Sequence, residues 1–492
     1  MSKLIFEHSR AGRKGPDVGD FRGIEPVSPY LPAELRRERP IPLPEVSEVD
    51  LVRHYIELSQ KNFGVDTGFY PLGSCTMKYN PKLNEEIAAM MEFTELHPSQ
   101  PEDTAQGALR LMWELSEALK EIAGMDAVSL PPAAGAHGEL AGMLMFRRYF
   151  DERGEDRRVM FIPDSAHGTN PASAVIAGFT VKEVDSNDRG IVTLSALKEA
   201  VAREGVETVA GIMMTNPNTL GLFEREVAEV AAYMHEIGAL LYYDGANLNA
   251  LLGYARPGDM GFDVVHFNLH KTFSTPHGGG GPGAGPVAAS GTIADYLPTP
   301  MVRKTDNRGA GGNTGYEFFA PSKSIGRMKL FYGNFLVLVR ALVYIRQLGS
   351  VGLKRVAENS VLNANYVQER LKKAYDIPYY QRCMHEFVLS GSRQKKESGV
   401  TAKDIGKKLL THGIHAPTMY FPLIVPEALM IEPTETESLE TLDAFCELML
   451  SFAEEIERDP EGFKDLSVLP IHHLDEVAAA RHPDVRWKPE EG

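Results

Sequence analysis

The chain has 492 residues, of which 43% are hydrophobic, and its formal net charge is −16 at pH 7. This length predicts roughly two to four domains of an enzyme-sized globular protein. The acidic balance argues against nucleic acid or an anionic membrane as the main partner, because both are negatively charged. We find no apolar run of about eighteen residues and no signal or transit composition, so we expect a cytoplasmic protein with small-molecule or protein partners.

Three cysteines, Cys75, Cys383 and Cys446, are far apart in the sequence and show no metal-ligand spacing. This pattern fits a reducing cytosol better than a disulfide framework. Each cysteine is most simply explained as a small buried hydrophobic residue. No metal site is predicted.

The chain divides into three predicted regions. Residues 1–80 contain an extended, proline-rich arm over about the first 50 residues, followed by a helix capped by Ser47 or Asp50. Residues 81–330 form a large α/β domain, and residues 331–492 contain a linking helix, a small C-terminal α/β domain and a tail. An arm of this length rarely stays ordered alone, so a partner subunit or the body of the protein should hold it.

Strand-like segments alternate with helical segments through the large domain. The predicted strands cover residues 158–163, 209–214, 238–243 and 264–267, with helices such as 195–204 and 227–237 between them. This alternation predicts a mainly parallel sheet with right-handed crossovers, which binds ligands outside the carboxyl ends of its strands. Polar clusters follow these strand ends at His167, Thr215, Asp244 and Lys271. We expect the four clusters to converge on one crevice.

Further elements are predicted outside this alternating region. Helices are expected at residues 82–93, 106–124, 325–348, 402–412 and 438–458, and a strand at 386–389. The segment 69–81 is rich in small polar residues between two prolines, and is as easily a structural turn as a loop that lines a site. The glycine-rich segment 301–324 is predicted to be an irregular loop that covers the crevice.

The stretch from Asp263 to Val287, DVVHFNLHKTFSTPHGGGGPGAGPV, delivers His270 and Lys271 to the end of a short apolar run. Most lysines are solvated surface groups. An amine at the carboxyl end of a buried strand is partly desolvated, however, which favours its neutral, nucleophilic form. This position predicts a Schiff-base lysine, for which the cofactor would be pyridoxal phosphate (PLP).

Gly278, Gly280 and Gly283 also satisfy the G-x-G-x-x-G pattern of dinucleotide sites. That motif leaves a strand and opens a helix. Here the following residues, Gly285-Pro286-Val287-Ala288, predict that a strand begins again, so a dinucleotide site is rejected.

The polar strand ends match what the ring of PLP requires. Asp244 would bind the pyridine nitrogen and keep it protonated, although an aspartate after a strand is more often a helix cap or a turn. Asn247 would reach the ring hydroxyl, and His167 would stack on the ring face. Thr215 is also predicted to contact the cofactor.

The phosphate of PLP would lie at the start of a helix. Ala134, Gly135 and Ala136 precede an apolar helical run, and backbone N–H groups at a helix N-terminus bind phosphate. This pattern is weak when taken alone, because many helices begin after glycine. His270 is expected nearby, with Ser322 or Ser324 as further candidates.

Four motifs, LGSCTMKYNP, AHGTNPASA, DGANLNA and NLHKTFSTPHGGGGPGAGP, resemble those of the glycine decarboxylase (P-protein) family of the glycine cleavage system. The order of phosphate loop, His, Asp and Lys also resembles the wider superfamily of fold-type I PLP enzymes. The animal and plant members of the family are much longer and contain two homologous halves. This chain resembles the lysine-bearing C-terminal half, and so looks like subunit 2 of the split bacterial form.

The resemblance implies an α/β, aspartate-aminotransferase-like fold with a mainly parallel central sheet. It also implies a PLP-dependent glycine dehydrogenase (aminomethyl-transferring), which decarboxylates glycine, releases CO2 and passes the aminomethyl group to the lipoyl arm of H-protein. The implied partners are a homologous subunit 1, with two copies of each chain, and lipoylated H-protein. Lys271, His167 and Asp244 would be the catalytic residues.

Two other interpretations stay open. The chain could be another fold-type I enzyme, such as an amino-acid decarboxylase or a cysteine desulfurase. A desulfurase needs a loop cysteine near the cofactor, and Cys75 lies upstream of the sheet, which makes this choice unattractive. The chain could also be a non-catalytic scaffold, although the presence of both Asp244 and Lys271 argues against that.

Overall fold

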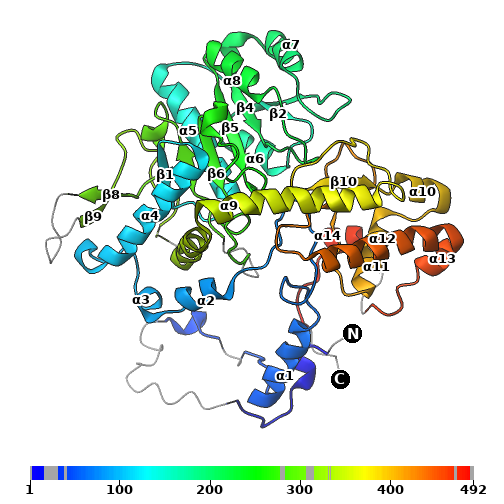
Figure 1. Cartoon of the computed structure of the whole chain (residues 1–492). Coiled ribbons are helices and arrows are strands. Elements are labelled where there is room, and N and C mark those ends of the chain that lie inside the picture. The colour runs from blue at the N-terminus through cyan, green and yellow to red at the C-terminus, as the bar shows by residue number, and fades with distance from the viewer. Residues whose placement is uncertain are drawn as a thin grey trace. The chain divides into compact units, whose positions relative to one another are not determined.

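The computed structural model describes residues 3–15, 31–37, 41–277, 283–305, 315–330, 332, 334–469 and 474–487 (Figure 1). The chain forms two compact units, Val65–Asp465 and the combination of Met1–Gly64 with Leu466–Gly492. Much of the predicted proline-rich arm and the glycine run at residues 278–281 lie outside the described residues. The domain boundaries expected near residues 80 and 330 stay predictions.

The unit that contains the N-terminal residues is built around helix α1 (Glu48–Ser59). The Ser47 hydroxyl accepts the Asp50 backbone N–H at 3.2 Å, which confirms the predicted cap. Within this unit, the ring of Phe6 stacks on that of Trp487 with centroids 4.3 Å apart, so residues near the two ends of the chain pack together. The unit also contains a short helix, α14 (Glu476–Arg481).

A mainly parallel sheet forms the centre of the other unit, as predicted. Its strands are β1 (Ala127–Ser129), β2 (Val159–Pro163), β3 (Thr180–Val184), β4 (Val209–Met214), β5 (Leu240–Gly245), β6 (Val264–Phe267) and β7 (Val287–Ala289). The spatial order is β1-β7-β6-β5-β4-β2-β3, and β7 alone among them runs antiparallel to its neighbours. The strand expected to follow the glycine run is therefore β7.

The central strands read as apolar runs because both of their faces are buried. On β5, Leu241 and Tyr243 belong to one hydrophobic core, while Leu240 and Tyr242 belong to the core on the opposite face. The helices that cover these faces are α4 (Gln106–Ala123), α5 (Gly135–Arg153), α6 (Thr169–Ile176), α7 (Leu194–Glu204) and α8 (Val227–Glu236). This layered arrangement leaves the carboxyl ends of the parallel strands open for polar side chains.

Three predicted elements differ from the structure. The helix expected over residues 82–93 is two helices, α2 (Lys82–Ala88) and α3 (Met91–Thr94). The helix expected over residues 325–348 begins only at Phe335 but ends at a kink at Gly349, as predicted, and a second helix follows; both helices carry the label α9 (Phe335–Leu371). The segment 301–324 was expected to be irregular, but its described parts contain the paired strands β8 (Met301–Thr305) and β9 (Gly315–Phe319).

Helix α9 runs from the sheet to a second hydrophobic core (Figure 1). This helix is long and apolar enough to span a membrane, with a mean hydropathy of 1.5 in its best window, of which 44% is buried in the protein. Core helices of globular proteins have the same property. Its residues up to Ala357 pack on the large sheet, and those from Ala364 pack in the second core, so the part of α9 after Gly349 joins the two cores.

The second core lies around a small antiparallel sheet, in the order β10 (Phe387–Ser390), β12 (Ala428–Ile431) and β11 (Thr418–Met419). Helices α10 (Ser392–Ser398), α11 (Ala402–Thr411), α12 (Leu439–Arg458) and α13 (Pro460–Phe463) complete it. The strand and the two helices predicted in this lobe are each found within one residue at either end. Phe387 pairs with Ile431, so the start of β10 lies beside the end of β12.

Candidate active site

A cavity of about 230 Å³ lies at the carboxyl ends of the parallel strands. Residues that follow β2, β4, β5 and β6, the start of α5, the segment 69–81 and the start of β10 line it. They are Ser74, Gly135, Ala136, Glu139, His167, Thr169, Thr215, Pro217, Thr219, Asp244, Ala246, Asn247, Asn268, His270, Lys271, His385 and Glu386. The four polar clusters that were expected to converge all contribute to this lining.

Asp244 is the second-last residue of β5 and lines the cavity. Its backbone pairs with that of His266 on β6, and its carboxylate lies 3.5 Å from the His266 ring nitrogen Nε2. Burial lowers the pKa of His266, so this ring is neutral. The Tyr242 hydroxyl lies 2.6 Å from the other ring nitrogen, and the Ala246 N–H donates to the carboxylate at 3.0 Å. Asp244 is therefore a fixed carboxylate facing the cavity.

Lys271 stands on a tight turn that follows β6. Its backbone N–H donates to the Asn268 carbonyl at 3.0 Å. The next residue, Thr272, is held twice, because its carbonyl accepts from the Lys78 ammonium at 2.7 Å and its hydroxyl accepts from the Leu248 N–H at 2.8 Å. The turn thus presents the half-buried Lys271 amine to the cavity from a rigid support.

The start of α5 also faces the cavity, through Gly135 and Ala136, while Ala134 is the N-cap residue. The positive end of the helix dipole is therefore directed at the cavity. A Cβ atom on Gly135 would lie 2.2 Å from the Asn268 side-chain oxygen, which explains why only glycine fits this approach. The other phosphate candidates are elsewhere in the described structure, because Ser322 is exposed and the Ser324 hydroxyl donates to the Leu297 carbonyl.

Five buried polar atoms of the lining have no hydrogen-bond partner among the described residues: Thr215 Oγ1, Asn268 Oδ1, His270 Nδ1 and both ring nitrogens of His385. Burial lowers the pKa of His270 to about 3, so its ring is neutral and its unpaired Nδ1 is available for a hydrogen bond. Unpaired buried polar atoms are costly unless a ligand or water satisfies them. Together with the helix start, Asp244 and Lys271, these atoms fit a polar, phosphate-bearing ring such as PLP.

His167 lies on the side of the cavity formed by the residues after β2. One of its ring nitrogens is 2.8 Å from the Thr169 hydroxyl, and its ring edge packs against Phe421 with centroids 5.4 Å apart. Asn247 is held by its neighbours, since its side-chain N–H groups donate to the Thr76 hydroxyl and, at 2.8 Å, to Glu432. The ring contacts expected for these two residues stay predictions.

Glu139 is a lining residue that the sequence did not single out. It sits one helical turn after Gly135 on α5, and its carboxyl accepts from the Thr169 hydroxyl at 3.2 Å. Burial, with the nearby charge of Asp244, raises the pKa of Glu139 to about 8. The spacing of four residues from Gly135 was available in the sequence and places both residues on one helix face.

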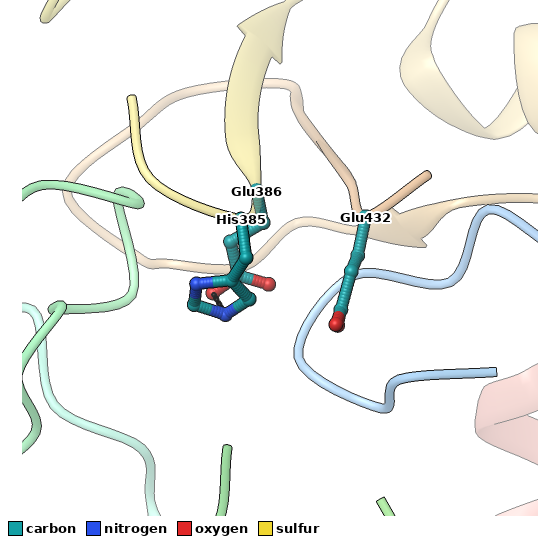
Figure 2. A group of neighbouring side chains, drawn as sticks. All are labelled: His385, Glu386 and Glu432. Carbon is teal, nitrogen blue, oxygen red and sulfur yellow. Dashed lines mark ion pairs between the residues drawn. The ribbon is translucent and has the colours of Figure 1, made fainter. Parts of the chain in front are cut away.

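The cavity wall that His385 and Glu386 form was also missed. Figure 2 shows these two residues and the neighbouring Glu432 projecting from the adjoining ends of β10 and β12. All three side chains are buried. Because an antiparallel pair places the residue before one strand beside the residue after the other, the flanks of LMIE and HEFV could have indicated this meeting point.

The segment 69–81 lines the cavity through Ser74. Both Ser74 and Thr76 have a positive φ, 64° and 52°, which is uncommon for residues other than glycine. Their backbone N–H groups donate to Glu386 at 2.6 Å and to Glu432 at 3.0 Å, respectively. The two glutamates therefore hold this turn in place, and the segment is a site-lining loop.

Cys75 occupies the same turn, although it precedes the whole sheet in the sequence. Its thiol is close enough to Lys271 for the two groups to interact electrostatically. Burial raises the pKa of Cys75, so it remains a thiol and not a reactive thiolate. Its upstream position in the sequence was therefore no reason to place it away from the site, but its environment does not favour a nucleophile.

We expect Gly285→Ala to destabilise the protein and distort the cavity. A Cβ atom at residue 285 would lie 2.0 Å from the Ala134 carbonyl oxygen, so the start of α5 would have to move. Overpacking of this kind costs about 1–3 kcal/mol, which urea unfolding can measure. Gly107→Ala on the exposed face of α4, where a Cβ would meet nothing within 4 Å, is the matched control and should be neutral. Equal stability of the two variants would contradict the expectation.

Comparisons with known proteins agree on one family. The probable glycine dehydrogenase (decarboxylating) subunit 2 of Caldanaerobacter subterraneus subsp. tengcongensis is 55% identical over 99% of this chain and 99% of its own length. The protein of the same description from Methylococcus capsulatus is also 55% identical, over 99% and 98% of the two chains. Residues 356–473 match the family described as glycine dehydrogenase, C-terminal domain.

Solved structures agree on the fold. A glycine decarboxylase (P-protein) of the glycine cleavage system, in inhibitor-bound form, superimposes with a TM-score of 0.72 at 22% identity, covering 86% of this chain and 94% of that one. A cysteine desulfurase from Thermococcus onnurineus NA1 gives 0.60 at 14% identity, over 79% and 95% of the two chains. The predicted fold-type I, aspartate-aminotransferase-like fold is confirmed. The chain belongs to the family of glycine dehydrogenase (decarboxylating) subunit 2.

Proposed function

We propose that this chain is the PLP-bearing subunit that decarboxylates glycine and passes the remaining aminomethyl group to the lipoyl arm of H-protein. One observation carries the proposal: Lys271, Asp244 and the start of α5 line a single cavity. These are the covalent, ring and phosphate contacts that PLP needs. Full-length relatives named glycine dehydrogenase (decarboxylating) subunit 2 support the same activity.

Several residues would hold the cofactor. The Lys271 amine would attach it covalently, and Asp244, backed by His266, would bind and keep protonated the ring nitrogen. Gly135 and Ala136 would offer backbone N–H groups to the phosphate. The remaining contacts are assigned to the backbone of Ala134 and to the side chains of His167, Thr215, Asn247 and His270. When bound, PLP supplies a ring that accepts the electron pair left as CO2 departs from glycine.

The side chains of the cavity would then do three things. Lys271 would move protons once glycine is bound and would later help to release the product. His167 and the wall formed by His385 and Glu386 would restrict how glycine lies, which matters because only the bond that is held perpendicular to the ring breaks readily. The lining would also keep bulk water from the reacting carbon.

The proposed partners are subunit 1 and H-protein. The words "subunit 2" in the names of the relatives imply a subunit 1, and we propose two copies of each chain. A lipoyl-lysine arm must enter the cavity from outside, so we propose that H-protein docks at its opening. The three cysteines are unpaired, which supports the expected cytoplasmic location.

Exchange of labelled bicarbonate into the carboxyl group of glycine tests this function. We expect little or no exchange with the chain alone, because fold-type I sites commonly need a second subunit, and strong exchange once subunit 1 and lipoylated H-protein are added. H-protein that lacks its lipoyl group is the matched control and should not support the reaction. Full turnover by the isolated chain, or no exchange in the complete mixture, would contradict the proposal.

A further inference from the structure

Two buried glutamates, Glu386 and Glu432, lie beside each other and His385 at the adjoining ends of β10 and β12 (Figure 2). Glu386 and Glu432 are 3% and 0% exposed. One carboxyl oxygen of each and one ring nitrogen of His385 all lie within 4.8 Å of one another. Two carboxylates this close and this buried repel each other strongly if both are ionised, so the pair retains a proton.

Four described titratable groups surround Glu386 and Glu432: Lys271, His385, Cys75 and Cys383. Lys271, from the turn after β6, is the facing cation and favours ionisation of both glutamates. Against it, burial together with the Glu432 charge raises the pKa of Glu386 well above its usual range, and burial raises the pKa of Glu432 to about 7. The other neighbours are uncharged, since burial lowers the pKa of His385 to about 3 and raises the pKa of the thiols of Cys75 and Cys383.

Glu386 and Glu432 accept hydrogen bonds, but the ring of the neighbouring His385 has none in the described part of the chain. The backbone N–H groups of Ser74 and Thr76 donate to Glu386 and Glu432, and the Asn247 amide donates to Glu432. Both ring nitrogens of His385 are buried without a hydrogen-bond partner among the described residues. Of the two glutamates, Glu386 is the one that lines the cavity. A proton on this pair therefore has an exit towards the cavity, through Glu386.

The proposed reaction consumes one proton at a defined step. As CO2 leaves, the electron pair of the broken carbon–carboxylate bond forms the new bond from the α-carbon of glycine to one sulfur of the lipoyl disulfide. The electron pair of the sulfur–sulfur bond stays on the second sulfur, which takes up a proton. Glycine enters as a zwitterion and its ammonium group must lose one proton to react. Glycine and the disulfide together therefore contain the same atoms and electrons as the products, which are CO2, the aminomethyl thioether and one thiol.

We propose that Glu386 is the acid that protonates the departing sulfur, and that Glu432 is a positioning residue that keeps this proton on the pair. The inference rests on the proposed function. After it gives up its proton, Glu386 takes one from the ammonium group of the next glycine, so the proton passes from nitrogen to sulfur without a net contribution from solvent. The turn at Ser74 and Thr76 fixes the two carboxyl groups during this cycle.

Infrared difference titration of the complete PLP-bound complex with subunit 1 tests the shared proton. Wild type minus Glu386→Gln should show the carbonyl band of one protonated carboxyl group at neutral pH. In Glu432→Gln this band should disappear at a lower pH, because the neighbouring negative charge is gone. Glu440→Gln is the control, an exposed glutamate outside the cavity lining that should leave the band unchanged. No band in the wild type, or a stoichiometric metal ion bound by the wild type and lost in both pair variants, would overturn the inference.

A comparison of two disulfides with different leaving groups distinguishes an acid role of Glu386 from a structural role. With lipoylated H-protein, Glu386→Gln should slow CO2 release from glycine by roughly 10²–10⁴-fold. With 4,4′-dithiodipyridine as the acceptor the slowing should nearly vanish, because its leaving thiolate needs no proton. Equal slowing with both disulfides would indicate a structural role and reject the inference. A wild-type complex that releases no CO2 from glycine would instead reject the proposed function.

Discussion

Replacement of Lys271 by alanine should abolish the covalent attachment of PLP and lower glycine turnover by roughly 10²–10⁴-fold. The reason is positional, because Lys271 presents its amine to the cavity beside Asp244 and the start of α5. Borohydride reduction of the wild-type complex, followed by digestion and mass spectrometry, should find the cofactor on the peptide that contains residue 271. The alanine variant should lack both that modified peptide and the visible absorbance of the bound cofactor.

Two further variants control this experiment. Lys271→Arg keeps the positive charge but not the nucleophile, and should lose covalent attachment as the alanine variant does. Lys198→Ala removes an exposed lysine from α7 and should behave as the wild type. Cofactor found on a different lysine, or full activity in Lys271→Ala, would show that the site has been placed wrongly.

The same measurements decide among the alternatives that the sequence left open. A non-catalytic scaffold would have no modified peptide to lose. A cysteine desulfurase would depend on Cys75, whose thiol interacts electrostatically with Lys271. Because burial raises the pKa of Cys75, we expect Cys75→Ala to leave glycine turnover largely intact. The similarity to a desulfurase structure is thus a similarity of fold.

The parts of the site that the sequence predicted share a simple geometry. Strands β4 and β6 were placed correctly to the residue, because both are buried on two faces and appear as short apolar runs between polar clusters. Once a parallel sheet is inferred, the carboxyl ends of its strands must lie along one edge. The convergence of Thr215, Asp244 and Lys271 follows from these two facts alone.

The missed parts depend on contacts between distant segments. His385 and Glu386 meet Glu432 only when β10 pairs with β12, and the Ser74 turn joins them only when the small lobe folds against the large sheet. No local period in the sequence carries that information. For α9 only the start was predicted wrongly, at residue 325 and not Phe335, because its break at the non-helical Gly349 falls where the predicted helix ends.

Lys78 connects these distant segments through a single buried ammonium group. Its side chain is 1% exposed and forms an ion pair with Glu435 at 2.8 Å. The same nitrogen donates to the Asn249 side chain at 3.2 Å, to the Thr272 carbonyl at 2.7 Å and to the Tyr344 hydroxyl at 3.1 Å. Burial opposes its charge, but Glu435 and Tyr344 more than compensate, so the pKa of Lys78 is raised. Through Lys78, Thr272 is therefore connected to α9 and to the small C-terminal lobe.

We expect Glu435→Gln to lower the free energy of unfolding by about 3–5 kcal/mol, because it leaves the Lys78 ammonium buried without a counter-charge. The double variant Lys78→Met with Glu435→Gln should recover much of that loss, since no unpaired charge remains. Lys82→Met, which removes a solvent-exposed partner of Asp66, is the matched control and should cause no measurable change in urea unfolding. Because Lys78 fixes the Thr272 carbonyl, Glu435→Gln should also weaken PLP binding at Lys271. Full stability of Glu435→Gln would mean that the buried ammonium does not organise this junction.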